Sequence, residues 1–210
     1  MKRDARRGAP TARLETRRPP ISRGAPPGEV RIIGGAWKRS KLAVPDRPGL
    51  RPTPDRVRVT LFNWLGADLT GWRCLDAYAG SGALGFEAAS RGAAEVVLLE
   101  RDRALVLHLD QARVRLHAEA VRVENADAIA WMARCAPARF DLVLLDPPFE
   151  SQAFEAALAA AVRVVAEGGW IYLVADRGVD PAGLPPLGVA LHRQGRAGAV
   201  HFHLLRRSGG

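Results

Sequence analysis

The sequence is poor in cysteine and has no long hydrophobic run. Its 210 residues include two cysteines, Cys74 and Cys135, which lie in apolar segments and lack the spacing of metal ligands. No apolar stretch approaches the roughly 20 residues needed to cross a bilayer, and the start of the chain lacks the hydrophobic segment of a secretory signal. These absences argue against a disulfide-rich secreted domain, a zinc site and a membrane anchor. They predict a cytoplasmic protein with reduced, buried thiols.

Acidic side chains are scarce in the first third of the chain. Residues 1–65 hold 16 Lys and Arg against 5 Asp and Glu, whereas residues 66–210 hold 15 against 17. The whole net charge of +9 therefore comes from the first third. This distribution is typical of a neutral catalytic body with a basic arm that binds a polyanion. Residues 1–28 are also rich in Pro, Gly and Ala and are expected to be disordered, so for them a solvated tail without a partner remains an equal alternative.

Beyond Gly71 the hydrophobic pattern alternates between strands and helices. It predicts strands over residues 74–77, 95–100, 120–124, 140–146 and 170–175, and helices over 82–91, 103–117, 128–134 and 152–166. Such alternation predicts a mainly parallel sheet with helices on both faces. Two further strands, 189–193 and 200–206, follow without a helix between them and should end the domain as an antiparallel pair.

The segment before this domain predicts a short hairpin and one helix. Residues 30–35 and 37–42 are expected to pair as strands around Gly34-Gly35. Thr53 is expected to cap the next helix, with Pro54 at its first position. The chain is thereby divided into a disordered basic tail (1–28), a hairpin extension (29–52) and a catalytic domain (53–210). The buried stripe of the helix should comprise Val57, Leu61, Phe62 and Leu65.

A glycine-rich loop joins the first strand of the domain to its helix. Gly80, Gly82 and Gly85 match the pattern G-x-G-x-x-G, in which glycines let the backbone approach a ligand closely at a helix start. Glu100 ends the second strand, 20 residues after Gly80. A carboxylate at that position can accept hydrogen bonds from both hydroxyls of an adenosine ribose. Taken alone, this arrangement fits NAD and S-adenosylmethionine equally well.

Asp76 and the motif at residues 146–149 favour S-adenosylmethionine over NAD. Asp76 ends the first strand, where it would repel a pyrophosphate but attract the cationic amino-acid part of S-adenosylmethionine. Asp127 follows the third strand and could accept a hydrogen bond from the adenine amine, cap the next helix, or do both. A nicotinamide enzyme would also have no evident use for the motif described next. No residues with the spacing of a metal site accompany the loop.

Asp146-Pro147-Pro148-Phe149 follows the apolar strand 140–145 and contains the residues that we expect to bind the reacting amine. Two prolines end the strand abruptly and place the motif at the carboxyl edge of the sheet, where open α/β sheets bind ligands. An exocyclic base amine is a poor nucleophile because its lone pair is delocalised into the ring. Asp146 and the Pro147 carbonyl can accept hydrogen bonds from that amine, while Phe149 stacks on the base. The motif therefore predicts methyl transfer to an amine of a planar base, mainly through positioning.

Seven sequence blocks resemble the RsmD family, whose members are bacterial 16S ribosomal RNA guanine-N2 methyltransferases that modify guanine 966. The resemblance covers about residues 29–206. Val59 and Ala36 depart from the family pattern. The matching blocks are Arg31-Ile32-Ile33-Gly34-Gly35, Pro45-Asp46, Leu50-Arg51-Pro52-Thr53, Asp55-Arg56-Val57-Arg58, Thr60-Leu61-Phe62-Asn63-Trp64-Leu65, Ala79-Gly80-Ser81-Gly82-Ala83-Leu84-Gly85 and Asp146-Pro147-Pro148-Phe149.

The resemblance implies a Rossmann-like class I methyltransferase fold: a seven-stranded, mostly parallel sheet with an antiparallel C-terminal strand, plus an N-terminal β-hairpin extension. It also implies a role for each matching residue. The cofactor S-adenosylmethionine would contact Asp76, Gly80, Ser81, Gly82, Glu100, Arg101, Asp127 and Ala128. Catalysis would rest on Asp146, Pro147 and Phe149. RNA would contact Arg31, Trp37, Lys38, Arg39, Lys41, Arg51, Thr53, Arg58 and Pro148.

The expected partner is 16S ribosomal RNA in the small subunit or in an assembly intermediate, and the expected state is a monomer. Two other functions stay open at this point. One is an adenine-N6 methyltransferase acting on DNA or another RNA, because the same motif handles any exocyclic amine. The other is an RNA-binding assembly factor that does not catalyse a reaction.

Overall fold

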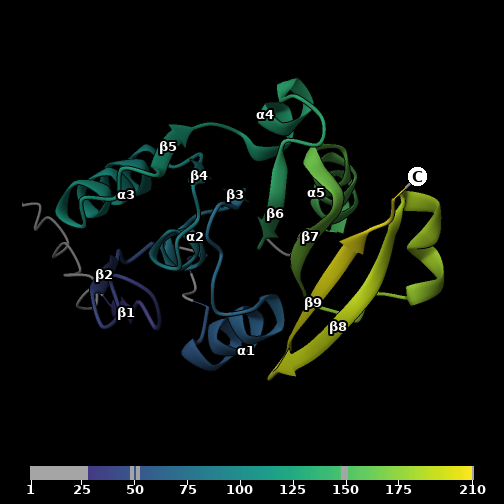
Figure 1. Ribbon diagram of the computed structural model, residues 1–210, viewed down its shortest axis with the longest axis horizontal. Helices are drawn as coiled ribbons and strands as arrows, with labels where there is room; N and C mark the ends of the chain where they lie inside the picture. Colours follow the sequence, from purple (N-terminus) through teal and green to yellow (C-terminus); the bar gives the residue numbers. More distant parts are fainter. Residues whose placement is uncertain (1–27, 48–49, 51–52, 148–150, 210) are drawn as a thin grey trace, which may run out of the picture.

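Seven strands form one twisted sheet at the centre of the molecule (Figure 1). The computed structural model describes residues 28–47, 50, 53–147 and 151–209. The predicted tail, apart from Gly28, and the site candidates Arg51, Pro148 and Phe149 lie outside these residues. The strands are β3 (Arg73–Asp76), β4 (Glu95–Glu100), β5 (Val121–Asn125), β6 (Phe140–Leu145), β7 (Val165–Ala175), β8 (Val189–Ala197) and β9 (Val200–Arg207).

The strand order in the sheet is β5-β4-β3-β6-β7-β9-β8. Strands β3 to β7 run parallel, whereas β9 pairs antiparallel with both β7 and β8. Two short 3-10 turns, Pro181–Gly183 and Pro185–Leu187, lie between β7 and β8. The predicted fold, with its antiparallel pair at the end, is confirmed.

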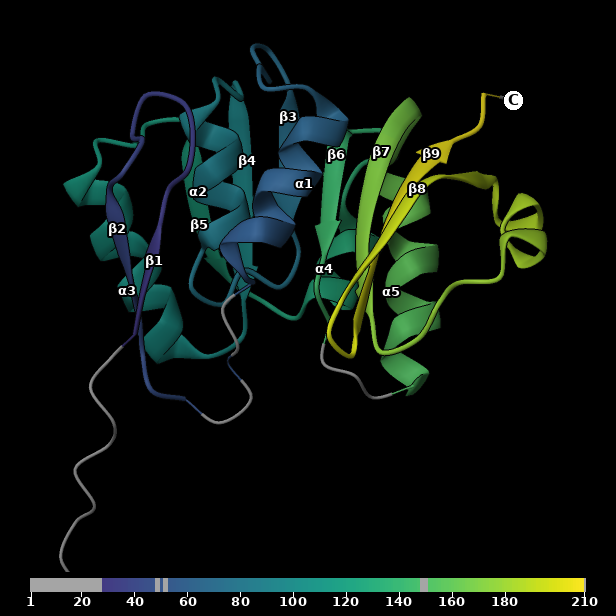
Figure 2. The ribbon, with the colours of Figure 1, turned by 90° about the horizontal axis from the view of Figure 1, so that it is seen from below.

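Helices cover both faces of the sheet, as Figure 2 shows from a second direction. One face packs against α1 (Asp55–Leu65), α2 (Ala83–Ser90) and α3 (Arg103–Arg115), and the other against α4 (Ala128–Arg134) and α5 (Ser151–Val164). The alternation of side chains along each strand divides the core: Leu98 points to the first layer and Val97 to the second. Cys74 and Cys135 are free and buried, as predicted. No helix among the described residues is long and apolar enough to span a bilayer.

The N-terminal hairpin, residues 28–44, forms a separate two-stranded sheet of β1 (Gly28–Arg31) and β2 (Lys41–Val44). The predicted strands 30–35 and 37–42 are therefore wrong where they approach each other: β1 already ends at Arg31 and β2 begins only at Lys41. The intervening chain leaves the ladder because it binds α2 instead: the Trp37 N–H donates to Ser90 Oγ over 2.9 Å. Gly35 has φ +72°, and a Cβ there would lie 1.7 Å from the Ser90 carbonyl oxygen. Only glycine allows this contact.

Three predicted element boundaries also need correction. Helix α1 begins at Asp55 with Pro54 as its cap residue, and Thr53 makes no capping hydrogen bond. The buried side of α1 includes Arg58 together with the predicted Val57, Leu61 and Phe62, whereas Leu65 is only partly buried. Helix α5 ends at Val164 and β7 begins at once at Val165, earlier than the predicted start of that strand at residue 170.

Candidate active site

Four carboxylates line the carboxyl edge of the sheet. Asp76 ends β3, Glu100 ends β4, Asp127 follows β5, and Asp146 follows β6. The order β5-β4-β3-β6 places these strand ends side by side. Within the described part of the chain, no Lys, Arg or His forms an ion pair with any of the four. This edge therefore offers a set of acceptors whose negative charge is not neutralised by a neighbouring cation.

The glycine-rich loop is tied to two of these carboxylates. The Gly80 N–H donates to Glu100 Oε2 over 3.0 Å, and the Gly85 N–H donates to Asp76 Oδ2 over 3.0 Å. A Cβ on Gly85 would lie 2.1 Å from Leu98 Cδ2, so the third glycine allows helix α2 to pack closely on β4. Loop and strand ends thus form one rigid unit.

These hydrogen bonds discriminate between the two cofactors that the sequence left open. A dinucleotide pyrophosphate needs free loop N–H groups at the helix start. Here the N–H groups of Gly80 and Gly85 already bind carboxylates, and that of Gly82 donates to the Ala79 carbonyl over 2.7 Å. A pyrophosphate would also lie against acidic side chains. Each carboxylate keeps further lone pairs for hydroxyl or ammonium donors. The residues present therefore suit S-adenosylmethionine better than a dinucleotide.

Burial makes Asp76 sensitive to a nearby cation. Its side chain is 1% exposed, and burial raises the pKa of its carboxyl to about 7. The hydrogen bond from Gly85 opposes this shift, while the charges of Asp146 and Glu100 add to it. A cation bound at this edge would favour the ionised form of Asp76. Contact between Asp76 and a ligand stays a prediction, because its side chain lies beneath the loop.

Asp127 caps helix α4, since its Oδ1 accepts a hydrogen bond from the Ala130 N–H over 2.9 Å. The capping alternative is thereby confirmed, while the adenine contact stays a prediction. Tyr78, which the sequence did not single out, is half-buried just before the glycines. Burial raises the pKa of its phenol, and the charge of Asp127 raises it further. The sequence feature that could have identified Tyr78 is its position as an aromatic residue two places before Gly80. The other cofactor candidates differ in exposure: Ser81 is partly buried, Arg101 exposed and Ala128 buried.

Asp146 lies beyond the end of β6, next to β3, with Pro147 buried behind it. Its Oδ2 accepts a hydrogen bond from the Thr53 hydroxyl over 3.4 Å. Burial raises the pKa of the Asp146 carboxyl to about 6, and the Thr53 bond opposes this shift. Thr53 was predicted to cap α1 and to contact RNA. Its hydroxyl makes no capping hydrogen bond and donates to Asp146, 93 residues away in sequence, while the RNA contact stays a prediction.

Aromatic side chains from three elements form a cluster that includes Tyr172. Trp64 of α1 packs against Phe202 of β9 with tilted rings whose centroids lie 5.4 Å apart, and the Phe202 centroid lies 6.5 Å from that of Tyr172 of β7. The Tyr172 hydroxyl is buried and has no hydrogen-bond partner among the described atoms. Burial and the charge of Asp146 both raise the pKa of Tyr172. Nothing in the sequence singled out Tyr172, because a tyrosine in an apolar strand resembles ordinary core.

The predicted RNA contacts divide into an exposed group and a buried one. Arg31, Lys38 and Arg39 are exposed on the N-terminal hairpin, and no described carboxylate pairs with them. Lys41 is also exposed but pairs with Glu29 over 2.7 Å. Trp37 is half-buried in the turn that contacts α2.

The prediction that Arg58 faces RNA is wrong. Its side chain is 0% exposed and is surrounded by Asp55, Glu87 and the Thr53 carbonyl, because α1 turns this face towards α2.

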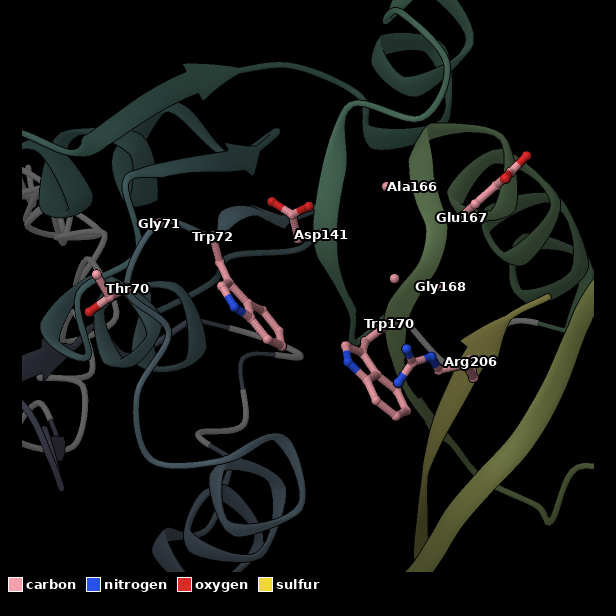
Figure 3. A pocket seen from close by; sticks show the side chains of 10 residues that line it. Thr70, Gly71, Trp72, Asp141, Ala166, Glu167, Gly168, Trp170 and Arg206 are labelled. Carbon is pink, nitrogen blue, oxygen red and sulfur yellow. The ribbon is translucent and has the colours of Figure 1, made fainter. Parts of the chain in front are cut away.

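A separate pocket of about 490 Å³ lies at the opposite, amino-terminal edge of β3 and β6 (Figure 3). Trp72 and Trp170 face this space, and the Arg206 guanidinium lies over the Trp170 ring at 4.2 Å. Asp141, which lines this pocket, forms an ion pair with Arg73, with 3.3 Å between Asp141 Oδ2 and Arg73 Nε. None of the predicted site residues lines this pocket, so the candidate site is the carboxyl edge.

The chain is similar to known proteins over most of its length. A family model described as conserved hypothetical protein 95 matches residues 30–206. The chain is 42% identical over 185 residues to ribosomal RNA small subunit methyltransferase D of Escherichia coli strain K12, covering 86% of this chain and 91% of that protein. It is 41% identical over 147 residues to the protein of the same name from Haemophilus influenzae, covering 69% of this chain and 74% of that one.

A solved structure of similar size shares the fold. The Escherichia coli protein yhhF superposes with a TM-score of 0.76 at 38% sequence identity, covering 87% of this chain and 100% of that chain.

Proposed function

The chain belongs to the RsmD family, matched here as conserved hypothetical protein 95, and from this premise we propose that it methylates a guanine of small-subunit ribosomal RNA on its exocyclic N2 amine. The proposed donor is S-adenosylmethionine, and the proposed base is guanine 966 of 16S ribosomal RNA. The observation that carries the proposal is the position of Asp146-Pro147 at the carboxyl end of β6, beside the strand that leads into the glycine-rich loop.

The cofactor would lie along β3, β4 and β5. When bound, S-adenosylmethionine supplies a methyl group activated by the sulfonium charge. Glu100 and Asp127 would accept hydrogen bonds from the ribose hydroxyls and the adenine amine, while Asp76 would stabilise the ammonium through its charge. The hydrogen bonds of the Gly80 and Gly85 N–H groups to Glu100 and Asp76 would hold the loop in place beside the bound cofactor.

The base would enter next to β6. Asp146 would accept a hydrogen bond from one N–H of the amine and the Pro147 carbonyl from the other, so that the nitrogen lone pair turns out of the ring plane. As the methyl group leaves the sulfonium sulfur and the N–C bond forms, one amine proton must leave, and the Asp146 carboxylate would accept it. These steps need an ionised Asp146, and its pKa of about 6 leaves it mainly ionised at neutral pH.

The proposal is tested by methyl transfer to small subunits from a strain that lacks this modification. Labelled methyl groups should appear on one guanine, found by digestion and mapping of the 16S RNA. Subunits from a strain that already carries the modification serve as the control and should accept none.

Label on adenine, or on DNA, would favour the adenine-N6 alternative. The absence of both methyl transfer and cofactor binding by calorimetry would favour a non-catalytic assembly factor. Naked 16S RNA, tested in parallel, would show whether the bound proteins are needed.

A further inference from the structure

A buried ionic cluster connects the N-terminal hairpin to the helix that follows the glycine-rich loop. Glu87 of α2 is 0% exposed. Its two oxygens accept hydrogen bonds from the Ile33 N–H over 2.7 Å and the Gly34 N–H over 2.8 Å. Arg91, one turn further along α2, donates to the same carboxylate over 2.9 Å. The hairpin is thus fixed to α2 through a carboxylate that no solvent reaches.

The same carboxylate contacts Arg58 of α1. Arg58 is fully buried and lies 3.5 Å from Glu87 Oε2 and 2.6 Å from Asp55 Oδ1. Two arginines therefore share Glu87, and Asp55 provides the second negative charge. A buried guanidinium keeps its position only when several acceptors surround it, because removal from water is otherwise too costly. Arg58 is consequently a rigid component of this region.

Arg58 extends the connection to Asp146. Its Nε donates to the Thr53 carbonyl over 3.3 Å, and the Thr53 hydroxyl donates to Asp146 Oδ2 over 3.4 Å. Both distances are long for hydrogen bonds, so the Thr53 hydroxyl depends on the surrounding structure to stay on Asp146. A continuous series of contacts, here called the relay, runs from the backbone of Ile33 and Gly34 through Glu87, Arg58 and Thr53 to Asp146.

We propose that Glu87 and Arg58 are positioning residues for methyl transfer, which hold the Thr53 hydroxyl against the Asp146 carboxylate. They thereby connect the RNA-binding hairpin to Asp146, the residue that would bind the guanine amine. Neither residue touches the base or the cofactor in this arrangement. The relay rests on the proposed function for its role in methyl transfer, but its contacts do not depend on which base is modified.

This proposal explains why an arginine occupies the buried face of α1. An apolar side chain at position 58 would pack with Val57, Leu61 and Phe62 and would need no carboxylate on α2. Because a buried ion pair often adds little net stability, we infer that this pair serves to fix its neighbours in place through its hydrogen bonds. Here the fixed element is the short segment around Thr53, which precedes α1 and has Asp146 within reach.

The test uses Thr53→Val, which removes the hydroxyl at nearly constant volume on a partly exposed residue, and Thr53→Ser, which keeps it. Each full-length variant is assayed for methyl transfer to unmodified small subunits across a range of pH. We expect kcat of Thr53→Val to fall by about tenfold to a hundredfold. We expect the acid limb of the native pH profile near pH 6, from the raised pKa of Asp146. In Thr53→Val this limb should move to higher pH because Asp146 loses a hydrogen-bond donor. Thr53→Ser should restore both quantities.

Glu87→Gln and Ser90→Ala separate positioning from simple attachment of the hairpin. Ser90 also fixes the hairpin to α2, accepting from the Trp37 N–H and donating to the Gly34 carbonyl over 2.6 Å, but it makes no hydrogen bond to Glu87, Arg58, Thr53 or Asp146 among the described residues. Ser90→Ala should therefore raise the KM for subunits and leave kcat and the pH profile unchanged. Glu87→Gln should raise KM, lower kcat and shift the acid limb. Equal behaviour of these two variants would overturn the proposal.

A measurement without substrate keeps the relay testable whatever the reaction proves to be. The Asp146 carboxyl can be titrated by carbon NMR in the native protein, in Thr53→Val and in Thr53→Ser. The relay requires a higher Asp146 pKa in Thr53→Val only. Identical titrations in all three proteins would refute the relay, whereas an inactive native enzyme with the expected titrations would refute the proposed function alone.

Discussion

Binding of a cationic cofactor should depend on pH through Asp76, and the structure sets the size of the effect. The Asp76 carboxyl is buried, is not ion-paired among the described residues, and has a pKa raised to about 7. A cationic ligand binds better to the edge when Asp76 is ionised. The ionised fraction rises from about one tenth at pH 6 to about one half at pH 7, so the affinity for S-adenosylmethionine should rise about fivefold over this interval.

The sign of the effect follows from the direction of the shift. Because the pKa of Asp76 in the folded protein lies above its ordinary value, the carboxyl is protonated over a range in which a free Asp would be ionised. Affinity is therefore lost as the pH falls through about 7. The cofactor's own amino group stays mainly protonated up to about pH 7, since free α-amino groups titrate at about 7.7–8.0. The change should accordingly come from the protein.

Calorimetric titration with S-adenosylmethionine at pH 6 and pH 7, in buffers of different ionisation enthalpy, measures both the affinity and the protons released. Asp76→Asn should bind with an affinity that is nearly independent of pH in this range and release fewer protons. The matched control is Asp146→Asn, which removes the neighbouring carboxyl of lower pKa and should keep most of the dependence. A native affinity that is equal at the two pH values, or a dependence that survives in Asp76→Asn, would refute the reasoning.

Three further predictions concern catalysis, the hairpin and the tail. Asp146→Ala should lower methyl transfer by at least about a hundredfold while cofactor affinity, measured by calorimetry, changes little; loss of cofactor binding would contradict the assigned role. Gly35→Ala should lower the melting temperature by several degrees and weaken RNA binding, because its Cβ would lie 1.7 Å from the Ser90 oxygen; Gly188→Ala, with φ +74° and open space around it, imposes similar backbone strain without that clash and should keep RNA affinity. Removal of residues 1–28 should weaken RNA binding and flatten its dependence on salt concentration, measured by filter binding; unchanged affinity at low salt would make the segment a passive tail.

The sheet and its glycine-rich loop were predictable because their signals are local. Alternating apolar runs, two prolines after residue 146 and three glycines at fixed spacing each determine structure within a few residues. The strand ends that carry Asp76, Glu100 and Asp146 followed directly, since parallel strands present their carboxyl ends at one edge. The comparisons with known proteins then confirmed the family that the sequence blocks had indicated.

The N-terminal segment was harder to predict because its partners are distant in sequence. Ile33 and Gly34 look like strand residues, but their N–H groups bind Glu87, more than 50 residues later, and the strand ends early. Arg58 looks like a basic surface residue of an amphipathic helix, and no local pattern reveals that a buried carboxylate faces it. Thr53 has the residue type and spacing of a helix cap, yet its hydroxyl reaches Asp146 instead. In each case a tertiary contact overrode the local preference.

The distribution of charge indicates how RNA would approach. Arg31, Lys38 and Arg39, which form no ion pair with a described carboxylate, lie on the hairpin, whereas the edge carries the carboxyl groups of Asp76 and Asp146. Phosphates would be attracted to the first surface and repelled by the second. A guanine can reach Asp146 only if its base projects away from its own backbone, as in a loop or after extrusion from a helix. The positive hairpin would hold the backbone and the negative edge would accept the base, so the rigid connection between them through Glu87 and Arg58 would fix the distance that the nucleotide has to span.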